Sequence, residues 1–229
     1  MTTIDLQKTL GLRRSPVAIR FQDAPSDGTR ALEKTEASGC SYWRLAGNGK
    51  SFFTEPKDHH GCPVGAHTHG IDLPPEKSEE LNQLIGTMVG LNYLSTEEVE
   101  GLPQRPGPFQ GAQYEPLSND TPTADVILFC GNAKQMMLVA EAAHAAGIES
   151  DFSLAGRPTC AAIPAVVQTG KAFTNLGCIG NRVYTELLDN EFYLALPGKA
   201  LGALLDSFET VHKANEALES FHQERAAGN

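Results

Sequence analysis

Four of the chain's five cysteines belong to a spacing pattern that occurs twice. Each copy has a cysteine, a Phe-Thr pair that begins thirteen residues later and a closing Gly-Cys pair: Cys40, Phe53–Thr54 and Gly61–Cys62 in the first copy, Cys160, Phe173–Thr174 and Gly177–Cys178 in the second. The closing pair arrives four residues sooner in the second copy, so the first copy carries an insertion there. Two half-sites of two cysteines each can meet as one four-thiolate site, which an iron–sulfur cluster or a structural metal requires.

The segments around the two copies follow one another in the same order: strand, helix, cysteine, short strand, Gly-Cys and helix. This order predicts an internal duplication in an α/β fold, or else a mixed α+β fold, with two pseudo-symmetric halves of short mixed strands and flanking helices. We expect a first half-repeat over residues 1–100, a connector rich in proline and glycine over 101–123 and a second half-repeat over 124–229, all in one compact domain. Chance similarity is the alternative, because few residues are identical between the copies.

The composition is that of a globular chain with an acidic excess. There are 28 acidic and 18 basic residues and no basic cluster of the kind that a phosphate backbone needs, so we expect no nucleic-acid partner. The first residues lack the features of a signal peptide and no long apolar run follows, which predicts a cytoplasmic protein without membrane attachment. Stable disulfides are rare in the cytoplasm, so the cysteines are either buried apolar residues or metal and catalytic groups.

Hydrophobic periodicity and turn residues place the cysteines on expected elements. We predict strands over residues 16–21, 51–54, 124–129, 172–175 and 191–196. We predict helices over residues 5–12, 30–37 and 79–91, a helix capped by Asn132, and a long C-terminal helix that Pro197 opens and that buries a face reaching to Leu218. Cys40 then lies just past a helix end, and residues 55–70, including Cys62, form a long loop. The 101–123 segment should cover a surface rather than form core.

The chemistry of thiolates narrows the choice of metal. Thiolates are soft ligands that suit iron–sulfur clusters, zinc and monovalent copper. Zinc usually takes paired knuckles such as Cys-x-x-Cys, and neither pair here is close in sequence. A 4Fe–4S cluster assembled from four separate segments is therefore the leading prediction, with zinc as the alternative cofactor.

The segment before Cys62 holds the candidate catalytic residues. His59 and His60 lie in the inserted region, where one of them could act as a further ligand or as a proton donor. They could equally be solvated loop residues. A cysteine nucleophile offers another mechanism, with Cys62 beside His59 or His60 as the best pair.

Four further residues are candidates for substrate binding. Trp43 lies three residues after Cys40 and could shield the site from water, although a lone tryptophan is also common in a core. Arg44 and Arg182 could bind a carboxylate or phosphate, or form structural ion pairs. Asn132 begins a predicted helix, where free N–H groups suit an anion.

Several of these segments together resemble a known family. They are Pro16–Ala18, Cys40–Ala46, Cys62–Ala66, Gly131–Gln135 and Gly177–Arg182, and in this order they resemble the domain of unknown function 169 family over nearly the whole chain. The resemblance implies a prokaryotic soluble domain and no secure reaction. It also implies that the four cysteines of the doubled pattern are motif residues, whereas Cys130 is not.

These observations favour an iron–sulfur protein that works in electron transfer or in reductive chemistry on an unidentified small molecule. The first alternative is a non-catalytic metal-thiolate protein, a carrier or sensor of zinc or copper. The second is an enzyme with Cys62 as nucleophile. We expect a small-molecule substrate or an electron-transfer partner, no nucleic acid and no membrane, and a homodimer is compatible with the sequence.

Overall fold

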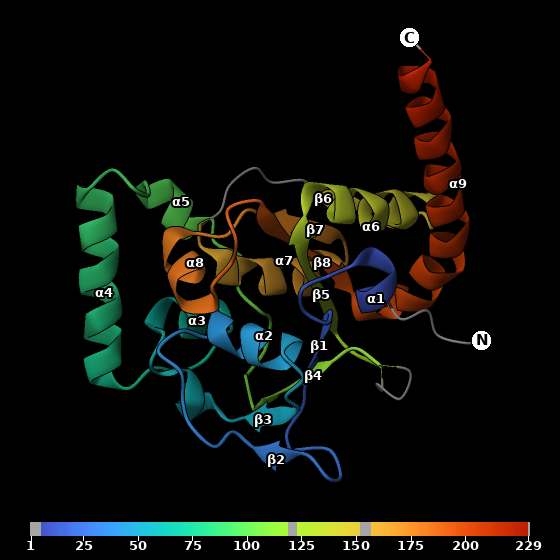
Figure 1. Ribbon diagram of the computed structural model, residues 1–229. Helices are drawn as coiled ribbons and strands as arrows, with labels where there is room; N and C mark the ends of the chain where they lie inside the picture. Colours follow the sequence, from blue (N-terminus) through green and yellow to red (C-terminus); the bar gives the residue numbers. More distant parts are fainter. Residues whose placement is uncertain (1–5, 119–122, 152–156, 229) are drawn as a thin grey trace.

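The computed structural model describes residues 6–118, 123–151 and 157–228 (Figure 1). Its first half contains α1 (Leu6–Leu10), β1 (Val17–Phe21), β2 (Arg30–Ala31), α2 (Cys40–Gly47), β3 (Phe52–Thr54), the 3-10 turn η1 (Pro56–His59), α3 (Pro63–Thr68), α4 (Pro75–Gly90), α5 (Thr96–Glu100) and β4 (Ala112–Pro116). Its second half contains β5 (Val126–Asn132), α6 (Ala133–Ala145), β6 (Ser150–Asp151), η2 (Thr159–Ala161), α7 (Ala162–Thr169), β7 (Ala172–Asn175), α8 (Ile179–Thr185), β8 (Glu191–Pro197), η3 (Gly198–Ala200) and α9 (Leu201–Ala227).

The strands form one mixed sheet whose order is symmetric about its centre. Among the described residues the order is β2-β3-β4-β1-β5-β8-β7-β6, so β1 corresponds in position to β5, β2 to β6, β3 to β7 and β4 to β8. The outermost pair is parallel at both ends, and the other neighbours are antiparallel. The expected mixed α/β architecture is confirmed. The duplication itself stays a prediction, and this arrangement is the one it would produce.

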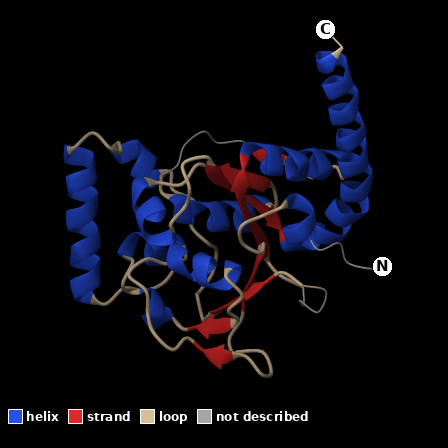
Figure 2. Ribbon diagram, in the orientation of Figure 1, coloured by secondary structure: helices blue, strands red, loops and turns tan. Residues whose placement is uncertain are grey.

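The side chains of the central strands alternate between two hydrophobic clusters, one on each face of the sheet. Val17 and Leu128 face the cluster that α2, α3 and α7 complete. Ile127 and Phe129 face the cluster that α1, α6 and α9 complete. Figure 2 shows the strands running through the middle of the molecule between these helices. The elements that carry Cys40 and Cys160 therefore lie on one face of the sheet.

Three local expectations from the sequence differ from the structure. The helix expected over residues 30–37 is wrong, because β2 pairs in parallel with β3 and Leu32 continues the pairing through its N–H to the Phe53 carbonyl at 2.9 Å. The 55–70 loop instead contains η1 and α3, each with a proline in its first turn. The 101–123 segment does not merely cover a surface, since β4 is an interior strand of the sheet with Tyr114 buried.

Two helices extend beyond the body of the molecule. In Figure 1, α4 lies at one side and the C-terminal part of α9 projects away from the sheet. The expected buried face of α9 is wrong at its far end, because Leu218 is 57% exposed. No helix in the part of the chain that the structure describes is long and apolar enough to cross a membrane.

Candidate functional site

The four cysteines of the doubled pattern lie where helical segments begin. Cys40 is the first residue of α2, so the expectation that it follows a helix end is wrong. Cys62 and Cys178 are the N-cap residues of α3 and α8. Cys160 lies in η2, directly before α7. Each half thus supplies one cysteine after its edge strand and one after the next strand, in agreement with the symmetric strand order.

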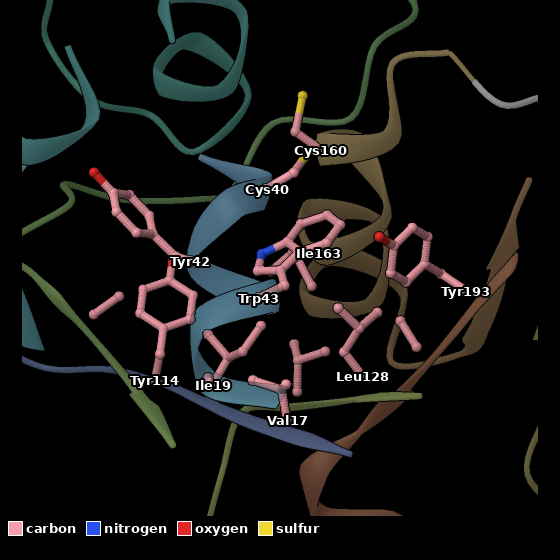
Figure 3. Packing of buried hydrophobic residues seen from close by; sticks show 14 of the residues in the cluster. Val17, Ile19, Cys40, Tyr42, Trp43, Tyr114, Leu128, Cys160, Ile163 and Tyr193 are labelled. Atoms are coloured by element: carbon pink, nitrogen blue, oxygen red, sulfur yellow. The ribbon is translucent and has the colours of Figure 1, made fainter. Parts of the chain in front are cut away.

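These four thiols are close enough to influence one another's ionisation. Burial raises the pKa of the Cys40 thiol well above its ordinary value, and negative charge on Cys160, Cys62 or Cys178 would raise it further. Burial likewise raises the pKa of Cys160, with Cys62 and Cys178 adding to the shift. Figure 3 shows Cys40 beside Cys160, above Trp43. The structure therefore brings thiols from both halves into one neighbourhood, where all four cannot carry negative charge without a compensating cation.

The cysteines differ in their exposure to solvent. Cys40 and Cys160 are buried, whereas Cys62 and Cys178 are partly exposed. Cys130 is a partly exposed thiol whose pKa is raised to about 12 by burial and by Glu191, against the opposing effect of neighbouring arginines, and it packs against the hydrophobic cluster that contains Cys40 and Cys160. Within residues 6–118, 123–151 and 157–228, no group of three or more His, Cys, Asp or Glu side chains is arranged to hold a metal ion.

Polar groups that the sequence analysis did not single out surround the thiols. The Asn181 backbone N–H donates to the Cys178 Sγ at 3.4 Å, and the Cys178 N–H donates to the Thr159 hydroxyl oxygen at 2.6 Å. The Asn181 amide opposes the rise in the pKa of Cys40, and the Thr68 hydroxyl opposes that of Cys160. Asn181 is 2% exposed, and its Nδ2 has no hydrogen-bond partner among the described residues. A buried amide donor near sulfur is suited to an anionic acceptor.

Hydroxyl groups lie beside the amide of Asn181. The Thr185 hydroxyl donates to the Asn181 backbone carbonyl oxygen at 2.8 Å and lies 3.4 Å from the side-chain Oδ1, and the Tyr193 hydroxyl donates to Thr185 at 3.2 Å. In this orientation Nδ2 is left without a partner among the described residues. Its position three residues after Cys178 is the one sequence signal that could have identified Asn181.

The two histidines proposed for catalysis occupy different environments. His59 is buried, with its Nε2 at 2.9 Å from the Thr54 hydroxyl, and its ring packs edge-on against Tyr42 and Phe109. His60 is partly exposed, although its Nε2 is buried without a hydrogen-bond partner in the described chain. The ring of a third histidine, His69, stacks at 6.3 Å from His59, and its Nδ1 lies 2.8 Å from the Gly65 carbonyl. The rings of His59 and His69 thus stack against each other, and the two residues flank Cys62 in the sequence.

Burial governs the protonation of this pair. Burial, with smaller contributions from the charges of His69 and His60, lowers the pKa of His59 to about 3, and burial lowers that of His69 to about 4. Thr54 Oγ1 donates to the Ala112 carbonyl at 3.1 Å, so it accepts from His59 Nε2–H. The Gly65 carbonyl accepts from His69 Nδ1–H in the same way. Both imidazoles are neutral and each has one assigned tautomer.

The four residues expected to bind substrate lie in three separate places. Trp43 and Arg44 line one small pocket beside α2, and the Trp43 ring packs edge-on against Tyr193 at 5.4 Å. Asn132 caps α6 on the opposite face of the sheet and lines a different groove, with α9. Arg182 donates to the backbone carbonyls of Leu176 at 2.6 Å and Leu188 at 3.0 Å, which fixes the turns before and after α8.

Comparison with known proteins identifies the family of the chain. The family model of domain of unknown function 169 (DUF169), described as "Uncharacterised ArCR", matches residues 5–207. The chain belongs to this family. The chain is also similar to the uncharacterized protein MJ0308 of Methanocaldococcus jannaschii, with 28% identity over 216 residues, which cover 89% of this chain and 91% of that protein. No solved structure matches the chain.

Proposed function

We propose that this DUF169 protein holds a metal–thiolate centre, most simply a 4Fe–4S cluster, through Cys40, Cys62, Cys160 and Cys178. The observation that carries the proposal is the influence of these four thiols, two from each half of a symmetric sheet, on the pKa of Cys40 and Cys160. Four cysteine thiolates are the usual ligand set of one iron–sulfur cluster.

The electrostatics of the thiols support a cation at this position. In the metal-free protein burial and mutual repulsion keep Cys40 and Cys160 protonated. A metal removes this barrier, because its positive charge replaces the protons and lowers the pKa of each coordinating thiol. The partly exposed Cys62 and Cys178 are N-caps of short helices, so they can adjust when metal binds. The free Asn181 amide would then donate to a thiolate or a bridging sulfide.

The surroundings favour a cluster over a single zinc ion. Each thiolate of a 4Fe–4S cluster binds a different iron, so the four sulfur atoms stand farther apart than around one zinc ion with its short Zn–S bonds. Here the four cysteines come from four different segments, none of them a paired knuckle. The apolar packing of Trp43, Ile163 and Tyr193 beneath Cys40 would limit water and suit electron transfer or reductive chemistry (Figure 3). Zinc remains the alternative cofactor.

The nucleophile hypothesis gains no support from the described contacts. No hydrogen bond joins the Cys62 thiol to a histidine ring in the part of the chain that the structure describes, and His59 Nε2 is already engaged by Thr54. A cysteine nucleophile needs a base within hydrogen-bond reach. The metal–thiolate proposal is therefore preferred. The hypothesis that Cys62 acts as a nucleophile stays a prediction.

Reconstitution with iron and sulfide tests the proposal. Under anaerobic conditions we expect a brown protein with broad visible absorption and equal iron and sulfide content. Replacing any one of the four cysteines, for example Cys40→Ser or Cys178→Ser, should reduce the absorption to a small fraction of the wild-type value. Cys130→Ser is the matched control and should reconstitute normally.

Two results would count against it. A colourless protein with one tightly bound zinc lost in the same four variants would replace the cluster with the zinc alternative. A protein that binds neither iron nor zinc, and whose Cys40→Ser and Cys178→Ser variants keep the wild-type fold, would overturn the proposal altogether.

A further inference from the structure

A small pocket lies beside α2 on the side of the sheet that carries the cysteines. Its walls include Trp43, Cys130 and Tyr193, and its charged groups are Arg14 and Arg44. Only a water-sized group fits inside, while the mouth is open to solvent. Arg14 lies three residues before β1. It is only 6% exposed, and such deep burial is unusual for an arginine. The pocket therefore brings two cations, one of them buried, to an accessible opening.

These cations lack a close counter-ion. Arg14 Nη2 lies 3.5 Å from the Glu186 carboxylate, and Arg44 reaches Glu186 and Glu36 only at 3.9 Å. All three distances exceed those of a charge-assisted hydrogen bond. Arg44 Nε is buried and has no hydrogen-bond partner among the described residues. The neighbouring Arg13 differs, because its guanidinium donates two hydrogen bonds to the Glu191 carboxylate oxygens, at 2.7 and 3.1 Å.

The single carboxylate that Arg14 and Arg44 share is weakly held. Glu186 is 69% exposed, and its backbone adopts the left-handed conformation with φ 56° and ψ 36°. A residue other than glycine is disfavoured there by about 1 kcal/mol. Arg13 Nη2 donates to the Glu186 carbonyl at 2.9 Å, which helps to hold this backbone. The Glu186 side chain thus lies near both guanidinium groups without forming a direct bond to either.

We propose that Arg14 and Arg44 bind the carboxylate of a small organic acid at the open mouth of this pocket, in the position that the Glu186 side chain now approaches. Planar guanidinium groups pair with the two oxygens of a carboxylate, and the flat ring of Trp43 forms one wall of the pocket. The remainder of the acid would extend toward solvent, beside the exposed Glu186 side chain.

The proposed acid would lie next to the thiol neighbourhood but does not depend on a metal there. Trp43 follows Cys40 by one turn of α2 and packs in the same cluster as Cys160. Cys130 in the pocket wall is a neutral thiol, because burial raises its pKa to about 12, so it does not repel an anion. Binding of the acid and reconstitution of the cluster can therefore succeed or fail separately.

Fluorescence of Trp43, the one tryptophan in the chain, reports on this pocket directly. Titration of the protein as purified with acetate and with succinate, at constant ionic strength in chloride, should give a saturable change in emission. Arg44→Gln should weaken binding about tenfold or more, the effect of one charged hydrogen-bonded pair. Glu186→Gln should strengthen it, because it removes the competing carboxylate. Arg30→Gln, at an exposed position on β2, is the matched charge control and should bind as wild type does.

The outcomes are distinct. Equal binding by wild type and Arg44→Gln, or no saturable change with either acid, would overturn the proposal. Saturable binding of inorganic phosphate in place of acetate would overturn the assignment to a carboxylate. Arg14→Gln removes a buried charge, so Arg14→Lys is used with it, and circular dichroism and the urea midpoint confirm that each variant is folded. Arg14→Lys keeps the charge but loses the planar fork, so it should also bind more weakly.

Discussion

Gly198→Ala is expected to destabilise the fold by about 4 kcal/mol or more, among the largest effects of a single substitution. A Cβ at Gly198 would lie 1.8 Å from the Ala124 carbonyl oxygen and 2.4 Å from its carbon. Both neighbours are backbone atoms, and the Gly198 N–H donates to the Asp125 carbonyl at 2.8 Å, which holds the two segments together. Relief would require moving the chain where β5 begins and β8 ends, at the Val126–Pro197 pair.

Urea unfolding measures this loss, and Gly202→Ala is the matched control. Gly202 lies four residues further on, inside α9, with open space where its Cβ would be. Alanine is preferred over glycine in a helix interior by about 1 kcal/mol, so this variant should be more stable than wild type. If Gly198→Ala unfolds within about 1 kcal/mol of wild type, the close approach of these two segments is wrong.

Local patterns were sufficient to predict five of the strands that the structure describes. Residues 17–21, 52–54, 126–132 and 191–197 are apolar or β-branched runs between turn residues, and each forms a strand close to its predicted bounds. The cysteine spacing predicted that thiols from both halves lie near one another, and thiols of both halves influence the pKa of Cys40 and Cys160. A repeated pattern allows contacts between residues far apart in the sequence to be predicted, because the equivalent segments of two repeats are expected at equivalent positions in the fold.

The strand β4 could not be predicted in this way. Its sequence alternates poorly, because the buried side chains include Gln113 between Ala112 and Tyr114. The Gln113 amide is satisfied by partners far away in the sequence, including the Ser26 N–H at 3.0 Å and the Gln22 amide at 3.0 Å. A buried glutamine is stable only where such partners exist, and nothing in the local sequence announces them.

The helix expected at residues 30–37 failed for the opposite reason. Its residues favour a helix, but the edge of β3 offers backbone partners that the isolated segment lacks, and β2 forms there. Tertiary pairing overrides a weak local preference. The same limit applies to the site, since Arg14 and Asn181 act through neighbours more than 25 residues away in the sequence, whereas Trp43 and Arg44 were found from their closeness to Cys40.

Acid should unfold this protein, because His59 and His69 are buried as neutral rings. The unfolded chain binds protons at these two positions near pH 6.5, but the folded protein does so only near the pKa values of about 3 and about 4. Between these limits the unfolded state binds more protons than the folded state. The contribution of the two histidines to the free energy of unfolding is therefore at its full value above about pH 6.5 and falls as the pH decreases. From pH 7 to pH 5 the loss is about 2 kcal/mol for each histidine, or about 4 kcal/mol together.

This loss hardly depends on the folded pKa values, because both lie at least a unit below pH 5 and the unfolded chain sets the size of the effect. His59→Gln keeps a donor in place of Nε2 for Thr54, and His69→Asn keeps one in place of Nδ1 for the Gly65 carbonyl. Each variant should lose stability at pH 7, yet should show about half the wild-type decrease between pH 7 and pH 5.

Urea unfolding at pH 7 and pH 5 measures this decrease in the free energy of unfolding, with the His222→Gln variant as control. His222 lies on the exposed end of α9 and is solvated in the folded and unfolded chain alike, so its removal should leave the decrease unchanged. A wild-type protein equally stable at pH 7 and pH 5 would show that water or a proton acceptor reaches the imidazole pair. A decrease that both substitutions reduce would show that the pair is shielded from water, because only a dry site keeps two neighbouring imidazoles neutral at pH 5.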